Sequence, residues 1–176
     1  MITCPSCGAE NLEGVDVCDD CQHSLTDLSF PSPLTAVEEG LLEDQIEILS
    51  PKTPLTVSLG TSVGEVLKKM VDKSIGCVIV VDDNGDGDQV RGIFTERDAL
   101  MRLGADVATY VDQPIESLMI PDPITLNARD KIAFALHKMD VGGYRHIPIL
   151  SEEKLVGVIS IRDILNYLTE RIGVSS

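Results

Sequence analysis

The chain has 176 residues, 43% of them hydrophobic, and a formal net charge of −15 at neutral pH. No apolar run approaches the roughly 18 residues of a membrane span and no signal peptide opens the chain, so we expect a soluble, cytoplasmic protein that binds no membrane. Residues 1–51 hold eleven Asp and Glu and no Lys or Arg. This acidic segment would repel phosphate backbones, which argues against a nucleic-acid partner.

Two Cys-x-x-Cys pairs lie near the N-terminus, Cys4 with Cys7 and Cys18 with Cys21. Their spacing is typical of a tetrahedral zinc site, and four thiolates leave no ligand position for water, which indicates a structural ion. The missing signal peptide argues against two disulfides. We interpret residues 1–25 as a zinc ribbon of the rubredoxin-like kind, a family whose members often serve as docking modules. The same cysteines fit a rubredoxin-like iron redox protein, an alternative that metal analysis resolves.

A linker is predicted over residues 26–43. It contains Pro31 and Pro33, and then Ala36 to Leu42 mix apolar and acidic residues, which favours one short helix at its end.

From residue 46 onward the chain repeats itself. Ile46-Glu-x-Leu49 matches Ile115-Glu-x-Leu118, and Pro54-Leu-Thr-Val57 matches Pro123-Ile-Thr-Leu126, both at an offset of 69 residues. Beyond Val80 the offset falls to 65, because the turn at 82–88 is four residues longer than its counterpart. One unit has been duplicated, so both copies should have the same fold.

Within each unit the pattern predicts strand, helix, strand, strand, helix. In the first copy, Ser62-x-x-Glu65 is a capping box before a helix with apolar residues at 63, 66, 67 and 70, residues 77–81 and 90–94 form paired strands, and a helix covers 96–102. The acidic turn at 82–88 resembles an EF-hand loop, but Ile93 stands where a bidentate Glu is required, so we reject calcium. The predicted fold class is α+β: two duplicated β-α-β-β-α units packed as a pair, preceded by a small zinc ribbon.

The strand-to-helix junction of each unit is the best candidate for a ligand site. Gly92-Ile-Phe-Thr-Glu-Arg-Asp98 returns as Gly157-Val-Ile-Ser-Ile-Arg-Asp163, and the first N–H groups of a helix suit an anion. Thr95-x-x-Asp98 and Ser160-x-x-Asp163 also fit capping boxes, which need no ligand. Arg97 and Arg162 oppose the helix dipole in the first turn, which favours an anion beside them.

Together with Gly143-Tyr-Arg-His-Ile-Pro-Ile149, these motifs resemble a tandem pair of cystathionine-β-synthase (CBS) domains, a Bateman module, over residues 44–104 and 113–173. The resemblance implies that AMP, ADP, ATP or a related adenosyl compound binds between the two units. It implies ribose contacts by Asp98 and Asp163, and phosphate contacts by Thr95, Ser160 and Arg145. Gly76, the counterpart of Arg145, has no side chain, so one site should be better equipped for phosphate. The adenine walls would come from Ile75, Tyr144, Leu49, Leu118 and Met119.

Two residues near these positions allow other interpretations. Tyr144 equally fits an ordinary core aromatic. His146 alternates with Arg145 along a strand, so we interpret it as structural or facing a dimer partner.

No nucleophile with a plausible base, open metal site or Walker-type loop occurs in the sequence, in keeping with a non-catalytic family. We therefore expect a regulatory sensor that is not an enzyme. The resemblance implies a homodimer, and helices such as 99–103 and 164–168, which expose apolar residues on more than one face, favour it as well. The protein should act on an unidentified protein partner docked by the ribbon. The alternative is a zinc-ribbon transcription-associated or nucleic-acid-binding factor dimerised by the CBS pair, which the acidic segment disfavours.

Overall fold

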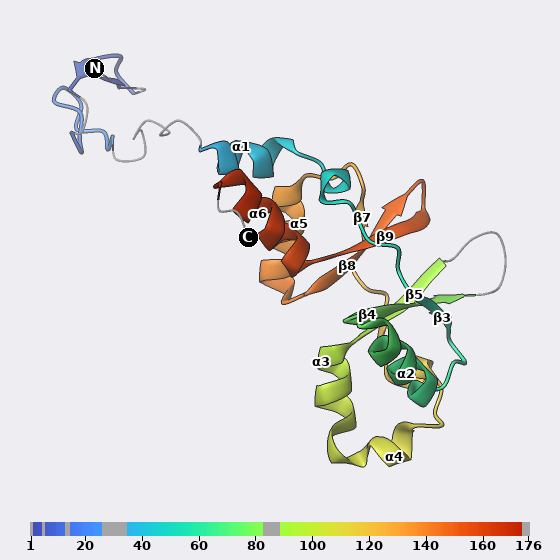
Figure 1. Cartoon of the computed structure of the whole chain (residues 1–176). Helices are drawn as coiled ribbons and strands as arrows, with labels where there is room; N and C mark the ends of the chain where they lie inside the picture. Colours follow the sequence, from blue (N-terminus) through green and yellow to red (C-terminus); the bar gives the residue numbers. More distant parts are fainter. Residues whose placement is uncertain (1, 5, 13–14, 26–34, 83–88, 174–176) are drawn as a thin grey trace. The chain divides into compact units, whose positions relative to one another are not determined.

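The computed structural model describes residues 2–4, 6–12, 15–25, 35–82 and 89–173. They fall into two compact units, Met1–Thr35 and Ala36–Ser176 (Figure 1). Residues 26–34 of the predicted linker and most of the predicted acidic hairpin loop, 83–88, lie outside the described residues. Among the described helices, none has both the length and the apolar character needed to span a bilayer.

The described residues of the N-terminal unit form only short elements of regular structure. Strand β1 (Ile2–Thr3) pairs antiparallel with β2 (Glu10–Asn11), and a single bridge joins Val17 to Ser24. Its buried cluster consists of Cys4, Cys18 and Leu25, with Ala9 and Val15 packed against them. So small a core cannot stabilise a fold alone, and such units usually depend on metal or disulfides.

The second unit contains two sheets with the same strand arrangement. In the first, β3 (Thr56–Ser58) runs parallel to β4 (Cys77–Asp82), which pairs antiparallel with β5 (Gln89–Thr95), followed by β6 (Ile120–Pro121). In the second, β7 (Leu126–Asn127) runs parallel to β8 (His146–Ser151), and β8 pairs antiparallel with β9 (Lys154–Ser160). The register shifts between Val80 and Val81 and again between Ile149 and Leu150, which are equivalent positions of the repeat.

The helices complete the predicted order, which is confirmed in both copies. α2 (Val63–Lys73) and α5 (Ile132–Gly142) connect the parallel strands, and α6 (Ile161–Arg171) closes the second copy. The helix predicted over 96–102 begins as α3 (Glu96–Asp98) and continues as a π-helical segment, Ala99–Leu103. It is followed by a 3₁₀ turn (Gly104–Asp106) and by α4 (Val107–Tyr110). Ser62 caps α2 as predicted, its hydroxyl accepting the Glu65 N–H at 3.3 Å.

Two short 3₁₀ segments are exchanged between the copies. Ile46–Leu49, which precedes the first copy, packs in the core of the second, where Ile46 contacts the cluster of Leu126 and Ile132. Ile115–Ser117, which precedes the second copy, packs in the core of the first. The limits predicted from the repeat, 44–104 and 113–173, therefore follow the duplication but divide both cores, because packing need not follow the repeat boundary.

The end of the predicted linker is helical and packed. α1 (Ala36–Glu43) contacts α5 and α6. Just beyond it, Asp44 accepts a hydrogen bond of 2.7 Å from the Tyr167 hydroxyl and forms an ion pair with Arg171. Residues 36–43 thus belong to the second unit, and the prediction of a linker is wrong for that part.

Candidate functional site

Two cavities lie where the closing junction of one copy meets the loop before β4 or β8 of the other. The Asp163 cavity, of about 380 Å³, contains residues 160–163 with residues 74–77 and 52–55 of the first copy. The Asp98 cavity, of about 540 Å³, contains residues 95–98 with residues 142–146 of the second copy. Both volumes fall within the range of about 300–1,000 Å³ for small-molecule sites. Gly76, Glu96, Arg145 and His146 line both.

The predicted ligand residues divide between these cavities and the cores. The Asp163 cavity is lined by Ile75, Arg145, Ser160, Arg162 and Asp163, and the Asp98 cavity by Thr95, Arg97, Asp98, Tyr144 and Arg145. Leu49, Leu118 and Met119 line neither cavity. Leu49 packs against the core of the second copy, and Leu118 and Met119 belong to the core of the first.

Both junctions are capped from within the chain. Asp98 Oδ2 accepts the backbone N–H and hydroxyl of Thr95 at 3.0 and 2.5 Å, and Asp163 Oδ2 accepts the same groups of Ser160 at 2.7 and 2.6 Å. The N–H groups of Glu96 and Ile161 donate to the carbonyl oxygens of Gly76 and Arg145, each at 3.0 Å. The capping interpretation is therefore confirmed. Attraction of an anion falls mainly to side-chain cations, since these donors are already bonded.

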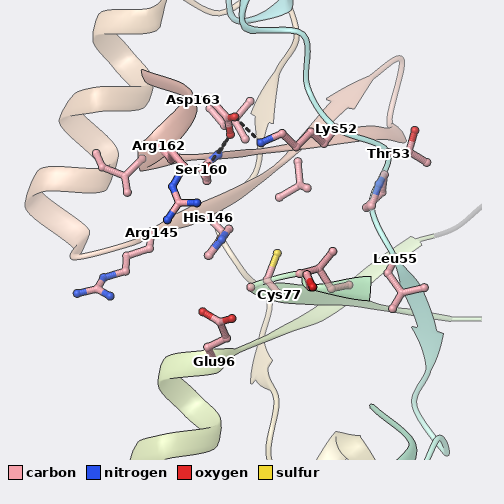
Figure 2. Close-up of a pocket in the computed structure, with 17 residues that line it drawn as sticks. Lys52, Thr53, Leu55, Cys77, Glu96, Arg145, His146, Ser160, Arg162 and Asp163 are labelled. Atoms are coloured by element: carbon pink, nitrogen blue, oxygen red, sulfur yellow. Dashed lines mark hydrogen bonds and ion pairs between the residues drawn. The ribbon is translucent and has the colours of Figure 1, made fainter. Parts of the chain in front are cut away.

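Lys52 is a site residue that the sequence did not reveal. Its Nζ lies 2.7 Å from Asp163 Oδ1 (Figure 2). Burial alone would raise the pKa of Asp163, but the hydrogen bonds from Lys52 and Ser160 outweigh burial and hold that pKa below its usual value. Its sequence counterpart is Pro121, so no repeated pattern marked Lys52.

In the Asp98 cavity the carboxylate has a different cationic partner. Asp98 is 9% exposed and is approached at 3.7 Å by Arg102, one turn further along its own segment. Arg102 also donates to the Leu118 carbonyl at 3.1 Å, which holds it outside the cavity lining.

His146 lies in the wall shared by both cavities, next to Arg145 in the chain. Its interpretation as a structural residue or as one that faces a dimer partner stays a prediction. Its Nδ1 is buried and has no hydrogen-bond partner among the described residues. Burial lowers the pKa of His146, and Glu96 and Asp163 offset this only in part.

Glu96 and Gly76 complete the shared wall. A Cβ on Gly76 would lie 3.1 Å from His146 Nε2 and 3.4 Å from Glu96 Oε2. Glycine therefore allows these two side chains to approach the chain at this point. Glu96 replaces the Ile161 of the second copy, so the shared wall carries a carboxylate as well as the Arg145 guanidinium.

Cys77 also lines the Asp163 cavity, yet it is an inert thiol. Only 7% of the residue is exposed, and burial, with a smaller effect of Glu96, raises the pKa of its thiol to about 12. The prediction of a buried structural cysteine is confirmed, because thiolate is the reactive form.

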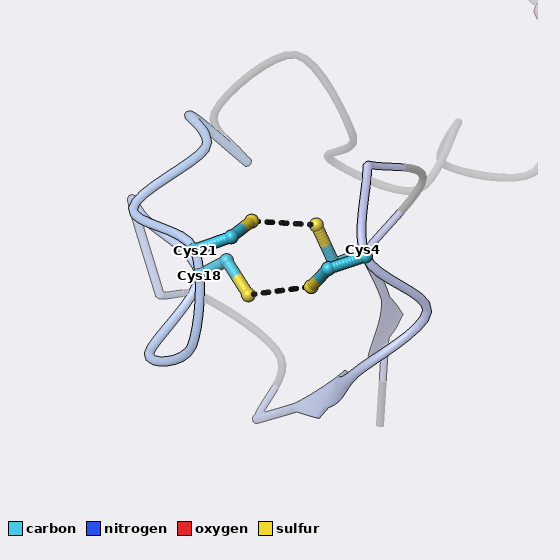
Figure 3. A group of neighbouring side chains, drawn as sticks. Cys4, Cys18 and Cys21 are labelled. Atoms are coloured by element: carbon cyan, nitrogen blue, oxygen red, sulfur yellow. Dashed lines mark hydrogen bonds between the residues drawn. The ribbon is translucent and has the colours of Figure 1, made fainter.

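The four N-terminal cysteines converge (Figure 3). Their sulfurs lie within 4.8 Å of one another, with Cys4 to Cys21 and Cys7 to Cys18 each 3.6 Å apart. Tetrahedral zinc with bonds of about 2.3 Å places sulfurs about 3.8 Å apart, so the donor set and its dimensions fit that ion.

The two knuckles repeat one backbone geometry. Gly8 N–H donates to the Cys4 carbonyl and Gln22 N–H to the Cys18 carbonyl, both at 2.9 Å, and both donors have positive φ, 77° and 59°. Buried Asn11 bonds to the second knuckle: its Nδ2 donates to Cys18 Sγ at 3.5 Å and its Oδ1 accepts the Asp19 N–H at 3.0 Å. The backbone N–H of Cys21 is the main cause that lowers the pKa of Cys18. For Cys7 a backbone hydrogen bond at Ala9 has the same direction, but burial and the hydrogen bonds to Cys21, Cys18 and Cys4 together raise its pKa.

Comparison with known proteins identifies the family of the second unit. The CBS domain family model matches residues 45–105 and 115–170. An uncharacterized 17.7 kDa protein in the bps2 3'region of Acidianus ambivalens is 32% identical over 115 residues, 65% of this chain and 66% of that protein. The chain spans only 22% and 42% of two other curated relatives.

Solved structures have the same fold. An uncharacterized conserved protein from Pyrococcus horikoshii is 31% identical with a TM-score of 0.62, over 72% of this chain and 92% of that chain. A CBS domain protein from Pyrobaculum aerophilum, complexed with AMP, is 25% identical with a TM-score of 0.61, over 72% of this chain and 98% of that chain.

Proposed function

Because the chain belongs to the CBS domain family, we propose that it is a non-enzymatic regulatory module that binds an adenosine nucleotide or a related adenosyl compound between its two CBS domains. The sites are the Asp163 cavity and the Asp98 cavity. The module changes its interaction with a protein partner when the ligand binds.

One observation carries this proposal: the Asp163 cavity gathers groups for each part of an adenosyl phosphate from both copies. Asp163 presents a carboxylate that can accept ribose hydroxyls, and Ile75 adds an apolar wall. Lys52, Arg145 and Arg162 supply cations for a phosphate. The AMP complex of the Pyrobaculum aerophilum relative supports this ligand class.

Titration calorimetry with AMP, ADP, ATP, S-adenosylmethionine and adenosine tests the function. At least one adenosyl compound should bind, and Asp163→Asn should weaken it by roughly ten- to a hundredfold, because a charge-assisted hydrogen bond is lost. GMP serves as the control for the adenine base. The proposal is abandoned if no adenosyl compound binds the wild-type protein, or if GMP binds equally well.

The N-terminal unit is proposed to hold one structural zinc ion on Cys4, Cys7, Cys18 and Cys21 and to dock the protein partner. The ion would fix the geometry of both knuckles, while the Asn11 amide helps to orient the Cys18 sulfur. Elemental analysis showing one zinc per chain supports it, and iron with visible absorbance would support the redox alternative.

The CBS pair is further proposed to form a homodimer. Leu100 and Met101, 78% and 77% exposed, and Leu165, 53% exposed, leave apolar surface that a second copy can cover. Sedimentation should therefore give about twice 19.0 kDa, and a monomer at tens of micromolar would contradict it.

A further inference from the structure

Lys52 is brought to the second junction by backbone pairing, although it lies 111 positions before Asp163 in the sequence. Its N–H donates to the Val158 carbonyl at 3.0 Å, and the Val158 N–H donates back at 2.9 Å. Val158 lies on β9, which leads into Asp163 at the start of α6. The Lys52 backbone is thus fixed, whereas its side chain is 66% exposed and has a flexible four-carbon stem.

The two oxygens of Asp163 have different partners. Oδ2 accepts the N–H and hydroxyl of Ser160, and Oδ1 accepts Lys52 Nζ. A ligand hydroxyl that donates to Oδ1 would therefore have to displace the Lys52 ammonium group or share this oxygen with it. The Ser160 contacts lie within one helical turn and need not change.

We propose that Lys52 determines the preference of the Asp163 cavity for an anionic adenosyl ligand by exchanging partners. When the cavity holds no ligand, Lys52 neutralises Asp163. When an adenosyl phosphate binds, a ribose hydroxyl takes its place on Oδ1 and the ammonium group moves to the phosphate. This inference rests on the proposed function, since it assumes that Asp163 receives the ribose.

The exchange favours phosphates over neutral nucleosides for an electrostatic reason. A nucleoside that displaces Lys52 leaves an ammonium ion without its counter-ion, whereas a phosphate supplies a new one. The Glu96 carboxylate in the shared wall repels anionic ligands, so the positive charge of Lys52 affects whether the net charge of the cavity lining attracts a phosphate. Residues lining the Asp163 cavity supply three cations, Lys52, Arg145 and Arg162, against Glu96 and Asp163.

The Asp98 cavity provides an internal comparison. Its lining supplies two cations, Arg97 and Arg145, against Glu96 and Asp98, and position 121, the counterpart of Lys52, is proline. The partner-exchange mechanism is therefore confined to the Asp163 cavity, which should be the site that prefers a phosphate.

The test compares AMP with adenosine by calorimetry, at low ionic strength, in the wild-type protein and in Lys52→Met. AMP affinity should fall by about tenfold, the effect of one lost charge-assisted contact, while adenosine affinity stays equal or rises because its competitor for Oδ1 is gone. Lys52→Arg, which retains the charge, should keep most of the preference for AMP. Lys69→Met is the matched control, because Lys69 pairs with Glu65 outside the lining of both cavities.

Opposite or divergent changes for the two ligands in Lys52→Met support the partner exchange. Equal losses for AMP and adenosine, or the same loss of AMP affinity in Lys69→Met, would overturn it while leaving the proposed function in place. A wild-type protein that binds neither ligand nor any other adenosyl compound would overturn both. Thermal unfolding of each variant shows whether a loss comes from unfolding instead of from the cavity.

Discussion

Ile46 and Ile115 occupy equivalent positions of the repeat, yet each is completely buried in the core of the opposite copy. Replacing either by alanine should reduce the free energy of unfolding by about 2–5 kcal/mol, the range for large-to-small changes in a core. Denaturant titration measures the loss. Ile48→Ala in the same segment, where the side chain is 55% exposed, should change stability by less than about 0.5 kcal/mol. Equal effects of Ile46→Ala and Ile48→Ala would contradict the packing described.

Acidification should destabilise the protein through His146. Burial holds the pKa of His146 below 6.5 in the folded protein, despite the opposing effect of Glu96 and Asp163, so the unfolded chain binds the proton first. Stability is therefore complete above pH 6.5 and falls as the pH drops below it. His146→Gln should flatten the profile of unfolding free energy between pH 7 and 5, and an unchanged slope in this variant would contradict the assignment.

Asp163 affects stability in a lower pH range than His146 does. Its folded pKa is below 3.8, so the stability it contributes is present above pH 3.8 and is lost as the pH falls through the folded pKa. Lys52→Met removes part of that shift, so the stability lost in acid should be smaller than in the wild type and the loss should be complete at a higher pH. An identical acid limb in the two proteins would show that the ion pair does not act in solution.

Removal of the metal should unfold only the N-terminal unit, because its buried cluster is too small to fold without an ion. After chelation, amide exchange should become fast in residues 6–12 and 15–25, while α2, α5 and the paired strands keep their protection. Unchanged exchange in the N-terminal unit would count against a structural metal. Readdition of zinc should restore the protection and serves as the control for irreversible damage.

The second knuckle should improve with glycine at position 22. Gln22 has φ of 59° in the same place where the first knuckle has Gly8, and a non-glycine residue in this region is strained. Gln22→Gly should strengthen metal retention by up to about 1 kcal/mol, measured by competition with a chelator. Gly8→Ala, the reverse change, should weaken retention, and the same sign for both variants would refute the argument.

Arg162 distinguishes a binding site from a capped helix. It lies in the first turn of α6, where a cation opposes the helix dipole, so Arg162→Ala should leave the protein without ligand equally or slightly more stable. The rise in melting temperature caused by AMP should nevertheless shrink, since a phosphate contact is lost. An undiminished rise in Arg162→Ala would remove this residue from the site; Arg97→Ala makes the same comparison for the Asp98 cavity.

The sequence predicted those parts of the fold that depend on local patterns. The β-branched run at 77–81 and the apolar face of 63–70 placed β4 and α2, and the repeat carried both elements over to the second copy. The paired glycine junctions also marked the two carboxylates around which the cavities form.

The remaining site residues depend on contacts between the copies, which no local pattern records. Lys52 reaches Asp163 only because its backbone pairs with β9, and Glu96 faces both cavities only because the two junctions approach Gly76. The family resemblance implied that Leu49 and Leu118 form adenine walls, whereas Leu49 packs against the core of the second copy and Leu118 lies in the core of the first.

The exchanged 3₁₀ segments also bear on how the CBS pair loses its structure. If the first copy unfolds, Ile115 loses its contacts with Val57 and Val63. The segment Ile46–Leu49, which precedes the first copy in the chain, then remains fixed only by its contacts with the second copy. The segment that precedes each copy thus completes the core of the other copy, so a copy isolated at the repeat boundary would lack part of its core. Residues 36–173 should consequently melt in one cooperative transition, with calorimetric and van't Hoff enthalpies that agree, although the chain contains the same domain twice.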